Sequence, residues 1–359
     1  MNRNNLMAVL IILLGMSSCE TSYRMVSRIN RDGSLYREVY ANGDSAFMAG
    51  NNSQNPFLFR IESDDWRLVK LDSSITFNFW GEEQNLNVKV CRTIPQMNGE
   101  YFEVPDMKKY AYPLAVPVER LEKKFRWFYT YYLYKAIYKE LPDKGPVPLS
   151  KYLTNEEQQI WFRGDKIAFS GLNGIELNNQ LDGLESKFWE WYNRSQYEIS
   201  YEIITHFASL NSDTSYIQRL QKLTETVYNK YFSSKQDDAT PEEVCGFLDK
   251  YDRAGYFSNL YKVNKKAIDT MFEERNRIVE LFGYRIWNEL SMPGKVISSN
   301  ALLQEGDSTV VWKVDAFRLL AGDYELLAES RVPNYWTFVV TLLVALFTVW
   351  CCWKARAKK

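Results

Sequence analysis

The strongest constraint on this chain lies at its C-terminal end, where an uncharged apolar run is followed at once by a basic tail. Residues Tyr335–Trp353 contain no charged side chain, and the tail at 354–359 reads Lys-Ala-Arg-Ala-Lys-Lys. A helix of this length rises about 28 Å, close to the ~30 Å hydrocarbon core of a bilayer. Tyr335 and Trp336 stand at one edge of the run and Trp350 and Trp353 at the other, as in an interfacial aromatic belt. We therefore expect a transmembrane helix at 335–353 rather than a buried core helix, with the basic tail in the cytoplasm.

The N-terminus carries a second membrane signal, which is too short to span. Arg3 precedes the eleven-residue apolar stretch Leu6–Met16, and Ser17 and Ser18 then lead to Cys19. Such a stretch is typical of a secretory signal peptide. The segment 16–19 resembles the lipobox of bacterial lipoproteins, in which the cysteine receives a diacylglycerol and becomes the first mature residue. The resemblance implies a signal peptide at 1–18 and lipidation of Cys19. The alternative is an ordinary signal peptide that ends beside a cysteine by chance.

These two signals together place the body of the chain outside the cytoplasm. Residues 19–334 lie between them, so in a double-membraned bacterium we expect a periplasmic ectodomain held on the inner membrane at both ends. Residues 19–333 carry 39 basic and 45 acidic side chains, and this mildly acidic body argues against nucleic-acid binding. The expected partners are the membrane itself, a lipid or glycolipid, and an envelope protein.

The cysteines and the single histidine provide no metal or redox motif. Cys351 and Cys352 end the apolar run, which leaves Cys91 and Cys245 in the ectodomain. An oxidising periplasm permits a disulfide between these two, but a single pair gives no framework and two buried free thiols are favoured. One histidine, His206, does not make a typical zinc site without cysteine support. We expect His206 on a packed helix, and neither a metal nor a cofactor.

Compact catalytic motifs are absent from the sequence: it has no GxSxG, SxxK, HExxH, CxxC, GxGxxG or Walker-type loop. A glycosidase needs only two well-placed carboxylates. The adjacent acidic pairs are Asp64-Asp65, Glu156-Glu157, Asp237-Asp238, Glu242-Glu243 and Glu273-Glu274. Most of them fall at expected helix starts or on polar faces, where negative charge suits the helix dipole. We therefore assign no catalytic residue.

The chain before residue 150 has the alternating pattern of β-strands. The Asp32-Gly33 step predicts a first β-hairpin over 23–40, because glycine accepts a positive φ. Further strands are expected at 75–80 and 86–91. An aromatic run at 122–138 predicts one long strand with aromatic side chains on both faces. Such a strand is expected to lie at the centre of a sheet or under covering helices. This run could instead be a carbohydrate-stacking platform, but core packing is favoured.

Beyond a proline-rich break at 142–148 the pattern becomes helical. Thr154 and Glu157 predict a capping box at the start of a helix through Trp161. Helix-period segments follow at 176–209, 213–233, 241–251 and 262–283. Strand patterns return at 285–290, 292–297, 309–314 and 324–330.

The order of these elements predicts an α+β fold. We expect an antiparallel sheet built from N-terminal strands (19–150) and C-terminal strands (284–333), with a helical insertion at 151–283 and one C-terminal transmembrane helix. A sheet completed by both ends of the ectodomain would bring both of those ends close to the membrane.

The C-terminal strands also carry a family resemblance. It rests on Met292-Pro293-Gly294-Lys-Val, on Trp312 in an alternating strand and on Leu326-Leu327-Ala328-Glu-Ser330, followed by the apolar run and the basic tail. These features resemble the C-terminal half of LppM-like bacterial lipoproteins. The whole chain resembles an uncharacterised Bacteroidetes group of membrane-anchored lipoproteins rich in tyrosine and tryptophan. The resemblance implies envelope lipid or glycolipid binding, without ligand residues, and the helical insertion departs from the smaller family domain.

The sequence thus predicts a doubly anchored, non-catalytic envelope lipoprotein whose ectodomain binds an amphipathic ligand or a partner protein. One alternative is a structural or assembly subunit of an envelope complex. The other is a carboxylate-dependent glycan hydrolase.

Overall fold

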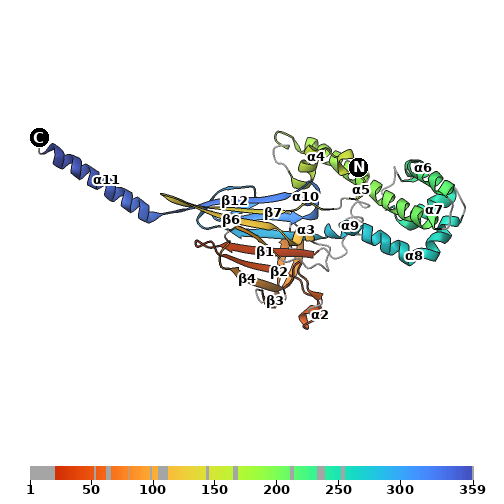
Figure 1. Ribbon diagram of the computed structural model, residues 1–359, viewed down its shortest axis with the longest axis horizontal. Coiled ribbons are helices and arrows are strands. Elements are labelled where there is room, and N and C mark those ends of the chain that lie inside the picture. Colours follow the sequence, from red (N-terminus) through yellow and green to blue (C-terminus); the bar gives the residue numbers. More distant parts are fainter. Residues whose placement is uncertain are drawn as a thin grey trace. The chain divides into compact units, whose positions relative to one another are not determined.

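The protein has a mixed α+β fold that divides into two compact units (Figure 1). The computed structural model describes residues 21–51, 54–61, 66–79, 81–97, 99–103, 112–142, 145–164, 169–210, 214–232, 239–251 and 255–357. The sheet unit consists of the described residues within 1–139, 283–315 and 323–359, and the helical unit of those within 140–282 and 316–322. Within these residues there are two β-sheets and ten α-helices.

The first sheet has seven strands in the order β10-β11-β8-β1-β2-β4-β3. Their bounds are β1 (Thr21–Ile29), β2 (Leu35–Ala41), β3 (Arg67–Phe79), β4 (Glu82–Ile94), β8 (Tyr284–Ser291), β10 (Leu303–Glu305) and β11 (Thr309–Asp315). The hairpin predicted around Asp32-Gly33 is confirmed: β1 and β2 pair antiparallel, and Gly33 has φ +100°. The short helix α2 (Ser45–Met48) follows β2.

The second sheet has five strands in the order β5-β6-β7-β12-β9. Their bounds are β5 (Gly99–Phe102), β6 (Val118–Arg126), β7 (Tyr129–Tyr138), β9 (Lys295–Ser299) and β12 (Tyr324–Pro333). The helix α3 (Tyr112–Ala115) precedes β6. Tyr134 of β7 and Trp312 of β11 pack with ring centroids 6.5 Å apart, so side chains of the two sheets meet in one core.

The prediction of one antiparallel sheet is wrong in two respects. The strands form two sheets. Alternate residues of β7 are buried, whereas those between them are partly exposed, so the five-stranded sheet has one apolar face to cover. The seven-stranded sheet packs against that face. In addition, the pairing that joins the N-terminal and C-terminal strands, β1 with β8, is parallel. The chain returns to the sheet beside the start of β1, where the Thr21 amide donates to the Gly283 carbonyl, and β8 therefore runs in the same direction as β1.

The single long strand predicted at 122–138 is also wrong, because β6 and β7 form a hairpin that turns at Trp127 and Phe128. β7 buries Thr130, Tyr132, Tyr134, Ala136 and Tyr138 on one face. No glycine, proline, asparagine or aspartate marks this turn, so the usual turn chemistry is missing from the sequence.

The helical unit begins with the predicted capping box. Thr154 accepts from the Glu157 amide and Glu157 accepts from the Thr154 amide, at the start of α4. The elements of this unit are η2 (Leu149–Lys151), α4 (Asn155–Gln158), the π-helical turn η3 (Gln159–Arg163), α5 (Gly174–Ser209), α6 (Thr214–Tyr231), α7 (Pro241–Tyr251), α8 (Tyr256–Arg275), α9 (Arg277–Leu281) and α10 (Ala316–Leu320). The long helix α5 packs against α6, α7 and α8 around an apolar core that includes Tyr197, Ile204 and Phe257.

The last helix, α11 (Tyr335–Arg356), is the one helix in the described chain that is long and apolar enough to cross a membrane. It continues directly from β12, as Figure 1 shows. Thr337 is its only buried residue.

The start of β1 and the start of α11 lie at opposite ends of the strands of the sheet unit. The Arg31 carbonyl, in the β1–β2 turn, accepts from Lys123 Nζ at 2.7 Å and from the Tyr132 hydroxyl at 2.6 Å, close to the tip of the β6–β7 hairpin. The turn after β1 therefore lies toward α11, and Thr21 lies at the far end of β1. A nine-residue strand spans about 30 Å.

Candidate functional site

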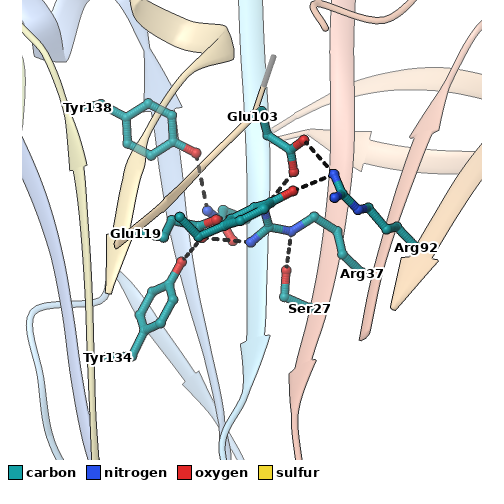
Figure 2. A network of polar contacts seen from close by, with 9 residues as sticks. Ser27, Arg37, Arg92, Glu103, Glu119, Tyr134 and Tyr138 are labelled. Carbon is teal, nitrogen blue, oxygen red and sulfur yellow. Dashed lines mark hydrogen bonds and ion pairs between the residues drawn. The ribbon is translucent and has the colours of Figure 1, made fainter. Parts of the chain in front are cut away.

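A buried ion cluster joins the two sheets and is the least expected polar feature of the sheet unit. Arg37 of β2 is 1% exposed, Glu119 of β6 is 1% exposed and Glu103, which follows β5, is 2% exposed. Arg37 Nη1 and Nη2 donate to the two oxygens of Glu119 at 2.8 and 2.6 Å, and Nη1 also donates to Glu103 Oε1 at 3.2 Å. Arg37 Nε donates to Ser27 Oγ at 3.0 Å, so one guanidinium holds three strands and the segment after β5 (Figure 2).

Further polar side chains border this cluster. The Tyr134 hydroxyl donates to Glu119, and Asn288 Nδ2 donates to the Tyr138 hydroxyl at 3.5 Å. Arg92 Nη1 lies 4.0 Å from Glu103 Oε2, an oxygen that has no hydrogen-bond partner among the described residues. Burial raises the pKa of Glu103 above its ordinary value, against the lowering effect of Arg37. Burial and the Glu119 carboxylate also raise the pKa of Tyr134 well above its ordinary value.

The carboxylates of this cluster are buried among the residues that the structure describes. A glycosidase must place two carboxyl groups on either side of a bound sugar. Here Glu103 and Glu119 share Arg37 Nη1, and both are almost fully excluded from solvent. The arrangement therefore acts as an ionic clamp between the sheets rather than as an acid–base pair.

Sequence reasoning missed Arg37, Glu103 and Glu119, although one signal for Arg37 is present. Arg37 alternates in register with Leu35 and Val39, so it occupies a core-facing position of β2. A charged side chain at a position that the alternation assigns to the core predicts a buried partner. The sequence does not show which carboxylate supplies it, because Glu119 is 82 residues away.

A second candidate is a hollow of about 500 Å³ between α5 and α6 of the helical unit. Its lining includes Arg194, Glu198, Glu202, His206 and Glu225. Arg194 donates to Glu198 Oε1 at 2.7 Å and to Glu225 Oε2 at 3.0 Å, and Arg275 donates to Glu202 at 2.6 Å. The hydrogen bond from Arg194 is the main cause that lowers the pKa of Glu225.

Every carboxylate in this hollow thus accepts a hydrogen bond from an arginine. The hydrogen bond from Arg194 favours the ionised form of Glu225, whereas a general acid needs a raised pKa. His206 lies exposed in the last turn of α5, with its ring edge-on to Phe207 at 5.5 Å.

The third candidate is the junction between the β6–β7 hairpin and α11. The Asn334 amide donates to the Phe128 carbonyl at 2.9 Å, and its side-chain nitrogen donates to the carbonyls of Arg126 and Trp127 at 3.0 and 3.2 Å. Asn334 Oδ1 accepts from Thr130 Oγ1 at 2.9 Å. One residue between β12 and α11 therefore makes four hydrogen bonds to the hairpin, which fixes the start of α11 on the sheet unit.

The other residues singled out in the sequence do not form a common site. Cys19, Asp64-Asp65 and Asp237-Asp238 lie outside the described residues. Glu156-Glu157 and Glu242-Glu243 occupy the first turns of α4 and α7, and Glu273-Glu274 lies near the end of α8.

The four described cysteines are free thiols. Cys91 is buried in the sheet unit and Cys245 in the helical unit, whereas Cys351 and Cys352 are exposed on α11. Burial is the main cause that raises the pKa of the Cys245 thiol to about 12. No group of three or more histidine, cysteine, aspartate or glutamate side chains that could hold a metal is found in the described chain.

Comparisons with protein-family models, with curated proteins and with solved structures found no match to this chain. The resemblance described for residues 292–330 accordingly remains an expectation.

Proposed function

We propose that this protein is a membrane-anchored, non-catalytic envelope protein that presents its extracytoplasmic units to a partner protein. In this proposal α11 crosses the inner membrane, the basic tail lies in the cytoplasm, and both the sheet unit and the helical unit lie in the periplasm. The observation that carries the proposal is the attachment of α11 to the sheet unit through Asn334.

A flexible linker would be enough to retain a protein on a membrane. Here β12 passes into α11 with no intervening loop, and Asn334 ties that junction to the neighbouring hairpin. A rigid mount of this kind sets the orientation of the sheet unit with respect to the bilayer. Fixed orientation is useful to a protein that must present a surface to a partner at a defined height above the membrane.

The hollow of the helical unit offers polar groups to a partner protein. Charged and hydroxyl side chains, among them Arg194, Glu202 and Thr205, line the α5–α6 hollow together with apolar surface. Two features disfavour the glycan hydrolase alternative: the sealed state of Glu103 and Glu119, and the arginine pairing of the hollow's carboxylates.

Acylation of Cys19 remains a further prediction, and the fold sets a condition on it. Cys19 is two residues before Thr21, which is at most about 7 Å of extended chain. Because Thr21 starts at the end of β1 opposite to α11, a lipid on Cys19 and α11 share one bilayer only when the strands lie along its surface.

Two measurements on the full-length protein in its native membrane test the proposal. Protease added to intact spheroplasts should digest the periplasmic units. An epitope tag added to the basic tail at 354–359 should stay intact. A photo-crosslinking residue at Gln221, in the hollow, should give a discrete protein adduct that is absent when the same group is placed at Leu68, which is exposed in the sheet unit. Protection of both units from protease would refute the topology. Recovery of a bound lipid, with no adduct from Gln221, would favour the amphiphile version.

A further inference from the structure

The tip of the β6–β7 hairpin exposes large aromatic side chains beside the start of α11. Phe125 is 57% exposed, Trp127 47% and Phe128 38%. Tyr335 and Trp336 of α11 are also exposed, at 73% and 56%. Exposed aromatic side chains gathered in one place mark an interaction surface rather than a chance distribution.

These rings are packed against α11 and not only near it. Phe125 stacks on Trp336 with centroids 6.2 Å apart, and Phe128 lies 4.7 Å from Phe338. Trp127 Nε1 donates to Thr341 Oγ1 at 2.8 Å, and Thr341 in turn donates to the Thr337 carbonyl at 2.7 Å. Thr341 thus lies on the side of α11 that faces the hairpin.

The contact with Thr341 sets how deep the hairpin tip lies. Thr341 is six residues beyond Tyr335, which is about 9 Å along a helix axis. If the apolar run from Tyr335 to Trp353 fills the hydrocarbon core, the Trp127 indole cannot stay in bulk water while it bonds to Thr341. Tryptophan and tyrosine are the residues that favour the boundary between headgroups and acyl chains.

Two arginines flank the aromatic tip. Arg126 lies over the Tyr131 ring at 5.5 Å and Arg331 over the Tyr129 ring at 4.7 Å. Neither has a carboxylate within salt-bridge distance in the described parts of the chain, although residues 19–333 carry a net excess of acidic side chains. Arginine side chains at the boundary of a bilayer can reach the lipid phosphates, which lie outside the acyl region.

We propose that the β6–β7 hairpin tip is a second membrane-binding element, in which Phe125, Trp127 and Phe128 enter the headgroup boundary of the bilayer that α11 crosses, and Arg126 and Arg331 bind lipid phosphates. The occupant of this aromatic surface is a phospholipid bilayer. The inference rests on the proposed function in one respect, because α11 must cross a membrane for the hairpin to reach it. It also requires the hairpin end of the sheet unit to face the bilayer, so immersion of the hairpin tip and attachment of a Cys19 lipid to the same bilayer are mutually exclusive orientations.

A spin-label experiment on the full-length protein in vesicles tests this inference. In a background with Cys19, Cys351 and Cys352 replaced by serine, a nitroxide is attached at Phe128→Cys or at Phe125→Cys. The label at Ile75→Cys is the control, since Ile75 on β3 is 40% exposed and so matches Phe128. Val339→Cys reports on α11 itself. Accessibility to oxygen and to a water-soluble nickel complex then measures immersion, and thermal unfolding checks that each variant is folded.

We expect the ratio of oxygen to nickel accessibility at positions 125 and 128 to exceed that at position 75 several-fold. Adding phosphatidylglycerol to phosphatidylcholine vesicles should increase the ratio further. The pair Arg126→Gln and Arg331→Gln should abolish this increase. The pair Lys262→Gln and Lys266→Gln, which removes the same charge from exposed sites on α8, should leave it unchanged.

The outcomes separate this inference from the function on which it rests. An immersed label at 339 with water-exposed labels at 125 and 128 overturns the hairpin inference and leaves α11 as the anchor. A water-exposed label at 339 refutes the proposed function itself. Labels at 125 and 128 that are shielded from both reagents would show that protein, such as a second copy of the chain, covers the tip, and would also overturn the inference.

Discussion

Arg37 and Glu119 face each other across the core of the sheet unit and form two parallel hydrogen bonds, at 2.8 and 2.6 Å, between a strand of the first sheet and a strand of the second. A guanidinium and a carboxylate match each other in this fork geometry. Because both side chains are only 1% exposed, each needs the other to compensate for the loss of water. The packing of the two sheets against each other therefore depends on both members of this ion pair.

Replacing Arg37 alone should be strongly destabilising. Arg37→Met leaves Glu119 buried without its counter-charge, and removal of one partner of a buried ion pair costs about 3–5 kcal/mol. Denaturant unfolding of the full-length protein in detergent should show a loss of this size. The triple variant Arg37→Met, Glu119→Leu and Glu103→Gln should recover most of it, because none of the three buried charges of the cluster then remains without its partner. A single variant as stable as the wild type would show that the clamp does not hold the sheets.

Glu103 should make stability depend on pH in a defined direction. Burial raises its pKa in the folded protein above the ordinary value of 4.5 at which the unfolded chain ionises. The folded state therefore binds the proton more tightly. The contribution to the free energy of unfolding is fully present below about pH 4.5 and is lost as the pH rises through the folded pKa.

Glu103→Gln cannot ionise. The substitution should therefore remove the part of the fall in the free energy of unfolding with rising pH that Glu103 causes. Urea midpoints compared at a series of pH values, from below the ordinary value of 4.5 up to neutrality, measure the effect. Glu305→Gln, at an exposed position of β10, serves as the control and should keep the wild-type slope. A Glu103→Gln slope equal to that of the wild type would contradict the prediction.

Gly294 should tolerate no side chain. It has φ +74°, and a Cβ added there would lie 2.3 Å from the Arg331 carbonyl oxygen of β12. Gly306 has a similar φ of +63° but open space around it. Gly306→Ala should therefore cost only the conformational strain, about 1 kcal/mol, whereas Gly294→Ala should cost at least about 3 kcal/mol because backbone must move. Thermal unfolding of the two variants provides the comparison, and equal losses would rule out the clash.

The two buried thiols should be unreactive in the folded protein. A pKa of about 12 keeps Cys245 protonated at neutral pH, and both Cys91 and Cys245 are buried, so a maleimide should label neither. Mass spectrometry after denaturation without reductant should then find both sites labelled. Failure to label them until a reductant is added would instead reveal the disulfide that an oxidising compartment permits.

Cys19→Ala tests the lipid anchor separately from α11. The substitution should abolish incorporation of a labelled fatty acid, while α11 still holds the protein in the membrane fraction. Deleting residues 335–359 in the same variant should release the protein into the soluble fraction. Acyl label that persists in Cys19→Ala would place the lipid elsewhere or refute the lipobox prediction.

Elements defined by local chemistry were predictable from the sequence. The apolar length of α11, the Thr154–Glu157 capping box and the Asp32-Gly33 turn depend only on neighbouring residues. The β6–β7 turn was missed, because its aromatic residues carry no turn signal and α11 supplies contacts that the local sequence does not show. Asn334, which holds that turn to α11, looks in the sequence like an ordinary residue between a strand and a helix.

The sequence by itself determined which segments are apolar, which alternate and which follow the helical period, because hydropathy and backbone preference act over a few residues. Only the tertiary structure decided that the strands form two sheets, that Arg37 meets Glu119, and that Trp127 reaches Thr341 across 214 residues of chain. Such pairings depend on strand direction, register and the packing of distant side chains. No local pattern encodes which distant partner a side chain will find.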